Sequence, residues 1–63
     1  MLKQVKDIVT KYYKSGQIKS IDIENRSVYI DIIGQDLEKI DEKMKKEIYN
    51  LSVEKVSVIH LKG

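Results

Sequence analysis

The sequence predicts a small α+β domain, a two-layer αββαβ sandwich in which a three-stranded sheet carries both helices on one face. Three observations lead to this fold class. Apolar residues recur at helical spacing in residues 2–12 and again in residues 37–51. Residues 18–34 alternate apolar and polar side chains, as the two strands of a β-hairpin do. Residues 53–61 are rich in β-branched side chains, which favour a strand.

Chain length and composition predict one domain, residues 1–63, that gains stability by self-association. A chain of 63 residues buries only about 60% of its unfolded surface on folding. Small domains add disulfides, a structural metal or oligomerisation, and this chain has no cysteine and a single histidine. We therefore expect a homodimer.

The chain has no apolar run long enough for a membrane span and no apolar core of a signal peptide near Met1. We therefore expect a cytoplasmic protein with no membrane partner.

The first predicted helix is amphipathic and ends before the hairpin. Ser15 and Gly16 follow it, and Gly16 is predicted to be the C′ residue, because glycine adopts the left-handed conformation without strain. Its apolar stripe consists of Leu2, Val5, Ile8, Val9 and Tyr12.

The register of the hairpin follows from a two-residue turn at Asn25 and Arg26. In this register Lys19 faces Ile32. A slip of one residue would turn every apolar side chain to the opposite face, so burial selects this pairing. The residues that share the buried face are Ile21, Ile23, Val28, Ile30 and Ile32.

The second predicted helix begins at the capping residue Asp36 and closes near Asn50 and Ser52. Asp41 stands four residues before Lys45, the spacing of a solvated ion pair. Asp41 and its neighbour Glu42 are expected to face solvent rather than to act as an acid and base. The apolar stripe is Leu37, Ile40, Met44, Ile48 and Leu51.

The facing of the last strand stays open, because both alternating sets of its residues contain apolar side chains. One set is Ser57, Ile59 and Leu61, and the other is Val56, Val58 and His60. If Val56 and Val58 point toward the helices, the open face of the sheet carries an apolar group. That group, Tyr29, Ile33, Ile59 and Leu61, is a candidate protein interface.

The sequence predicts no catalytic site and no cofactor. It has no glycine-rich phosphate loop and no serine in a nucleophile-elbow motif. His60 is a weak candidate metal ligand that would need partners such as Asp22, Asp31 or a residue from a second subunit, because one imidazole does not make a site. The alternative, a partly exposed histidine near the strand end, is favoured.

The first helix is basic and offers a candidate nucleic-acid surface at Lys3, Lys6, Lys11 and Lys14. A solvated helix face is favoured over this interpretation, because a dedicated binder carries a stronger basic excess. We therefore do not expect nucleic acid as a partner.

The hairpin sequence IDIENRSVYIDIIG and the later segment VEKVSVI resemble the C-terminal domain of NifU-type iron–sulfur carriers. In that family a Cys-x-x-Cys loop follows the hairpin and holds the cluster, whereas Gln35 and Asp36 stand there in this chain. The resemblance implies the carrier fold without its cluster ligands.

The ending VEKVSVIHL, after the αββαβ order, is similar to the cytoplasmic domain of cation diffusion facilitators, which dimerises and often has a late histidine. His60 is the matching position.

Taken with the missing catalytic motifs, these patterns predict a non-enzymatic interaction module that self-associates or binds an unidentified protein. The alternatives are an accessory protein of metal or iron–sulfur handling and a weak nucleic-acid binder.

Overall fold

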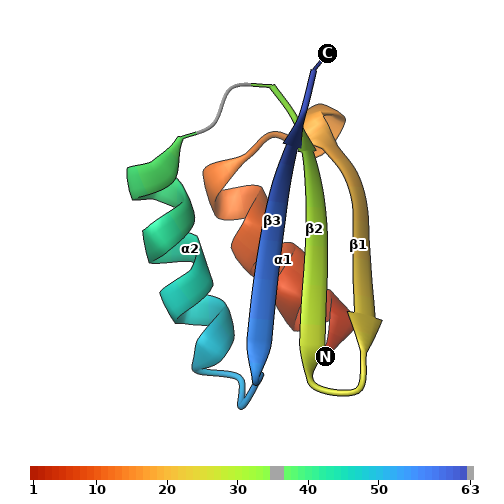
Figure 1. Ribbon diagram of the computed structural model, residues 1–63, viewed down its shortest axis with the longest axis vertical. Coiled ribbons are helices and arrows are strands. Elements are labelled where there is room, and N and C mark those ends of the chain that lie inside the picture. Colours follow the sequence, from red (N-terminus) through yellow and green to blue (C-terminus); the bar gives the residue numbers. More distant parts are fainter. Residues whose placement is uncertain (35–36, 63) are drawn as a thin grey trace.

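The computed structural model describes residues 1–34 and 37–62, and these residues form the predicted helices and strands in the predicted order, with one additional 3-10 turn (Figure 1). The predicted helix cap Asp36 lies outside the described residues. The elements are helix α1 (Leu2–Tyr12), the 3-10 turn η1 (Ser15–Gln17), strands β1 (Ile18–Glu24) and β2 (Ser27–Ile33), helix α2 (Glu38–Tyr49) and strand β3 (Lys55–Leu61). The described chain is thus a small α+β domain with a mixed three-stranded sheet.

The hairpin of β1 and β2 has the predicted turn and, over most of its length, the predicted register. Ile21 pairs with Ile30 and Ile23 pairs with Val28 in antiparallel strands. Asn25 in the two-residue turn has a φ of 56°, a left-handed conformation that asparagine tolerates well. The apolar alternation in the sequence therefore identified the buried face of this hairpin.

The predicted pairing of Lys19 with Ile32 is wrong. Ile18 pairs with Ile32, and the register shifts between Ile18 and Ser20. An extra residue in one strand changes which side chains face the core. Here the shift packs Ile18 against the core while Lys19 stays exposed.

The end of α1 also differs from the prediction. The helix ends at Tyr12, and Tyr13 follows in an extended conformation with its N–H donating to the carbonyl of Val9. Gly16 lies inside η1 rather than at a left-handed C′ position. The C-cap is Tyr13, two residues earlier than Ser15, and the Tyr13 side chain packs in the core, where it is 3% exposed.

The parallel pairing of β2 with β3 settles the facing that the sequence left open. Val28 pairs with Val56 and Ile30 pairs with Val58. Paired residues of neighbouring strands point to the same side of a sheet. We call this side the inner face. The opposite side, the outer face, carries Ser57, Ile59 and Leu61 of β3.

One hydrophobic cluster joins both helices to the inner face. Leu37, predicted to be buried in the stripe of α2, is instead 40% exposed at the start of that helix. The shared cluster supports the expectation that both helices pack on one face. Its buried members are Val5, Ile8, Val9, Tyr13, Val28, Ile30, Ile32, Met44, Ile48, Val53 and Val56.

Candidate functional site

The predicted interface residues lie together on the outer face, and we call Tyr29, Ile33, Ile59 and Leu61 the outer patch. Ile33 pairs with Leu61 across β2 and β3, so these two side chains are direct neighbours. Ile59 is 51% exposed, and the other three are partly buried. In Figure 1 the sheet lies in front of α1, so the reader looks onto the outer face.

Polar groups surround and interrupt the outer patch. Asp31 lies between Tyr29 and Ile33 along β2, and its Oδ2 accepts a hydrogen bond of 3.0 Å from Ser20 Oγ. The Nζ atom of Lys55 lies 5.7 Å from the centroid of the Tyr29 ring, within the range of a cation–π contact. The patch is therefore apolar with one fixed carboxylate at its middle.

A second group of polar side chains lies inside the domain and connects three elements. Tyr13 donates a hydrogen bond of 2.5 Å from its hydroxyl to Asp41 Oδ1. His60 Nε2 lies 2.6 Å from Asp41 Oδ2, and because an ionised carboxylate only accepts, the imidazole N–H donates. Tyr13, Asp41 and His60, which we call the buried network, link the end of α1 to α2 and β3.

The buried network overturns the prediction that Asp41 is solvated and paired with Lys45. Asp41 is 7% exposed, and its two oxygens accept hydrogen bonds from Tyr13 and His60. The expected solvation of Glu42 is confirmed, since that side chain is exposed. Burial of a carboxylate is costly unless its oxygens are satisfied, and here two neutral or cationic donors satisfy them.

His60 cannot use the metal partners in its own chain that the sequence suggested. Its side chain points to the inner face and is 10% exposed, whereas Asp22 and Asp31 lie on the outer face. Among the described residues, no three or more histidine, cysteine, aspartate or glutamate side chains gather closely enough to hold a metal ion. The favoured interpretation of a partly exposed histidine near the strand end agrees with its intermediate burial, and the structure adds its contact with Asp41.

The chemistry of the buried network is that of a structural tie. A general base must lie within hydrogen-bond reach of the proton it removes from a substrate. Asp41 has both oxygens engaged by protein donors, and all three side chains are nearly or fully removed from solvent. The network therefore fixes the positions of α1, α2 and β3 relative to one another.

Once the facing of β3 is known, the sequence carries a signal for the Asp41 and His60 part of this network. Asp41 stands three residues before Met44 and seven before Ile48, so it occupies the buried stripe of α2. His60 shares the alternation phase of Val56 and Val58 on β3. A carboxylate and an imidazole that both fall on core-facing positions indicate a buried pair.

The lysines of the candidate nucleic-acid surface, three on α1 and Lys14 just after it, are all exposed. One of them, Lys11, also contacts α2, with its Nζ 2.8 Å from Glu47 Oε1. The hydroxyl of Tyr12 donates to the other carboxylate oxygen of Glu47. Both hydrogen bonds lower the pKa of Glu47 from its ordinary value of 4.5, and the bond from Lys11 has the larger effect.

The lowered pKa of Glu47 predicts a pH-dependent contribution to stability. Because the folded-state pKa lies below the unfolded value, the contribution is complete above pH 4.5 and is lost as the pH falls through the folded pKa. We expect Glu47→Gln to melt at a lower temperature than wild type at pH 7 and at the same temperature at strongly acidic pH. A melting-temperature gap that persists at low pH would show that the carboxylate charge is not responsible.

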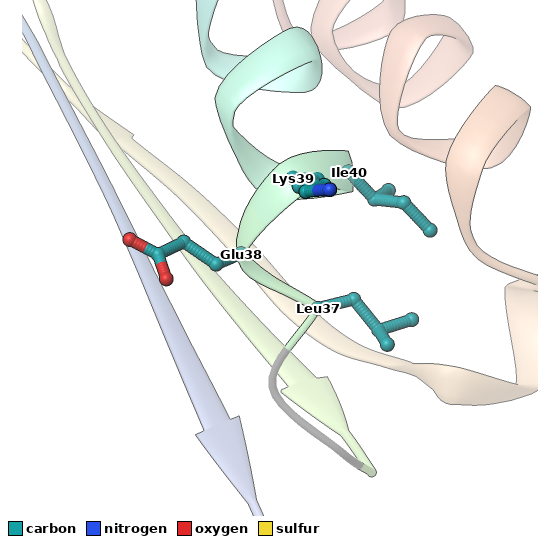
Figure 2. Close-up of a pocket in the computed structure, with 4 residues that line it drawn as sticks. All are labelled: Leu37, Glu38, Lys39 and Ile40. Carbon is teal, nitrogen blue, oxygen red and sulfur yellow. The ribbon is translucent and has the colours of Figure 1, made fainter.

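A shallow apolar depression lies at the start of α2 (Figure 2). Leu37 and Ile40 point to the same side of the helix, while Glu38 points to the opposite side, toward the strands. The four lining residues come from one turn of chain: Leu37, Glu38, Lys39 and Ile40. The depression offers apolar contact but no convergent chemistry.

Comparisons of the chain with protein-family models, with curated proteins and with solved structures find no match. The resemblances to the NifU-type domain and to the cytoplasmic domain of cation diffusion facilitators therefore stay predictions. Neither described helix is long and apolar enough to cross a membrane.

Proposed function

We propose that this chain is a non-enzymatic protein-interaction module whose contact surface is the outer patch. The observation that carries the proposal is the parallel register of β2 and β3. It sets Ile33 beside Leu61, and it turns Ile59 to the same side of the sheet, away from the core. Apolar residues that gather on one exposed face are typical of interaction surfaces.

The burial of the titratable groups supports the same proposal. Asp41 and His60, a pair that elsewhere could orient a catalytic base, are engaged with each other and with Tyr13 inside the domain. The outer patch, in contrast, is on the opposite face of the sheet, where Ile59 is exposed and the other three residues are partly buried. Side chains on strands present a more rigid contact surface than side chains on loops.

A peptide-display selection tests the proposal. Peptides selected on the wild-type protein should lose at least about tenfold in affinity for Ile59→Ser, because loss of an apolar anchor at the middle of an interface costs about 1–2 kcal/mol or more. The matched control is Leu2→Ser, since Leu2 is equally exposed, at 54%, but lies on α1. Selected peptides that bind wild type and Ile59→Ser equally would contradict the proposal.

Self-association through the outer patch is the form of this function that chain length predicts. A homodimer would be dissociated by Ile33→Asp, because the change sets a new charge inside the apolar contact. Sedimentation equilibrium measures this directly. A wild-type protein that stays monomeric at high micromolar concentration would remove the homodimer and leave another protein as the partner.

The metal-handling and nucleic-acid hypotheses receive less support. His60 is held by Asp41, and Lys11 is held by Glu47. We therefore develop the interaction module alone.

A further inference from the structure

We propose that the outer patch receives a cationic, apolar segment of another protein, with Asp31 pairing with a lysine or arginine of that segment. This inference rests on the proposed function above, and it adds the chemistry of the partner. Its starting point is the position of Asp31. The carboxylate lies between Tyr29 and Ile33 along β2, and Asp31 pairs with Ile59 of β3.

Asp31 is a fixed and partly buried charge rather than a mobile surface one. The hydrogen bond from Ser20 Oγ to Asp31 Oδ2 orients the carboxylate and leaves acceptor capacity on it. Apolar neighbours on three sides reduce its hydration. A partner that covered the patch would remove the remaining water from this carboxylate, and the cost is offset only by a charged or hydrogen-bonding group on the partner.

The sign of charge on the outer face agrees with a cationic partner. Among the paired strand residues of this face, Asp22, Glu24 and Asp31 are acidic, and Lys55 is basic. The whole chain, in contrast, carries a formal net charge of +2. The outer face is therefore locally negative on a positive protein, so it attracts cationic groups and repels phosphates.

A second copy of the chain fits this face less well. A two-fold interface buries the same patch on both protomers, and it would therefore bury two Asp31 carboxylates. Within one protomer Lys55 is directed elsewhere, because it pairs with Ser27, four residues from Asp31 along β2, and its Nζ lies 5.7 Å from the centroid of the Tyr29 ring. Buried carboxylates without a cation destabilise an interface.

A lysine or arginine from another protein can cover the apolar surface of the outer patch and also supply a cation for Asp31. Its aliphatic stem packs on Ile33 and Ile59, and its charged end reaches Asp31. Arginine suits the site best, because its planar guanidinium binds a carboxylate through two parallel hydrogen bonds. Flanking apolar residues of the same segment would cover Tyr29 and Leu61.

Two matched amphipathic peptides test the inference with the folded protein. Both are about 16 residues long, so that a helix can form. One is built of leucine and arginine and the other of leucine and glutamate, each with a fluorescent label for anisotropy. We expect the arginine peptide to bind wild type and the glutamate peptide not to bind. We expect Asp31→Asn to weaken the arginine peptide about tenfold.

Glu42→Gln is the matched control, because it removes one negative charge from an exposed position of α2. We expect it to leave the affinity of the arginine peptide within about twofold, as a screened distant charge should. Equal affinities for Asp31→Asn and Glu42→Gln would overturn the inference, and so would a failure of the arginine peptide to bind wild type.

The experiment separates this inference from the proposed function and from a homodimer. If Ile59→Ser abolishes peptide binding while Asp31→Asn does not change it, the outer patch remains an interaction surface but its cationic partner is wrong. A homodimer predicts the opposite sign for Asp31→Asn, since removing the paired like charges would strengthen self-association in sedimentation equilibrium. That result would overturn the inference in favour of a second copy.

Discussion

Replacing Asp41 by alanine is expected to lower the free energy of unfolding by about 3 kcal/mol, because it leaves Tyr13 and His60 buried without their common acceptor. A domain of this size has a total stability of about 3–9 kcal/mol, so the variant would lose a large share of it. Urea unfolding followed by circular dichroism measures the difference by linear extrapolation.

Glu42→Ala is the matched control for Asp41→Ala. Glu42 is the next residue of α2 and is exposed, so its removal should change stability by less than about 0.5 kcal/mol. Tyr13→Phe removes one donor and keeps the ring, and we expect an intermediate loss of about 1–2 kcal/mol. An Asp41→Ala variant as stable as Glu42→Ala would show that the buried network does not hold the fold together.

Ile30→Ala is expected to cost about 2–5 kcal/mol, the range for truncating a fully buried isoleucine. Ile30 lies at the middle of the central strand, is 0% exposed and pairs with Ile21 on one side and Val58 on the other. The substitution leaves a cavity in the hydrophobic cluster that neighbouring side chains fill only in part. Thermal and urea unfolding of the same variant should agree on the loss.

Ile59→Ala is the control for Ile30→Ala, since it makes the same truncation on the outer face of the neighbouring strand. We expect a loss below about 1 kcal/mol, because half of this side chain is already in solvent. Equal losses for the two variants would mean that the faces of the sheet are assigned wrongly.

The hairpin was predictable from the sequence because both of its strands alternate strongly and because its turn is short. One error in its register arose at Lys19, where a shift between Ile18 and Ser20 lets an isoleucine replace a lysine beside the core. Local alternation does not reveal such an irregularity. It becomes visible only when burial of Ile18 is weighed against exposure of Lys19.

The buried network was missed because each of its members was interpreted on its own element. Asp41 fits an ion pair with Lys45 at helical spacing, and His60 fits an exposed strand end. The contact between Asp41 and His60 depends on how α2 packs against β3. Neither the helical spacing of α2 nor the alternation of β3 predicts that packing. Tyr13 was missed because α1 was expected to continue toward Gly16 instead of ending at Tyr12.

The outer patch was predictable in composition but not in facing. The sequence left the two alternating sets of the last strand open, and the parallel pairing of Val28 with Val56 decides between them. Once that pairing is known, the outer position of Ile59 and Leu61 follows from strand geometry alone. The charge on the same face, and the place of Asp31 in it, then define the partner that we propose.

The most direct test of the outer patch as the binding surface for a cationic, apolar segment is a methyl NMR titration of the isoleucine-labelled protein with the arginine peptide. Ile33 and Ile59 report on the outer patch, and Ile40 reports on the depression at the start of α2. We predict saturable shifts of the Ile33 and Ile59 methyl signals while the Ile40 signal stays in place. Shifts largest at Ile40, or no shift at Ile33 and Ile59 at saturating peptide, would contradict the account.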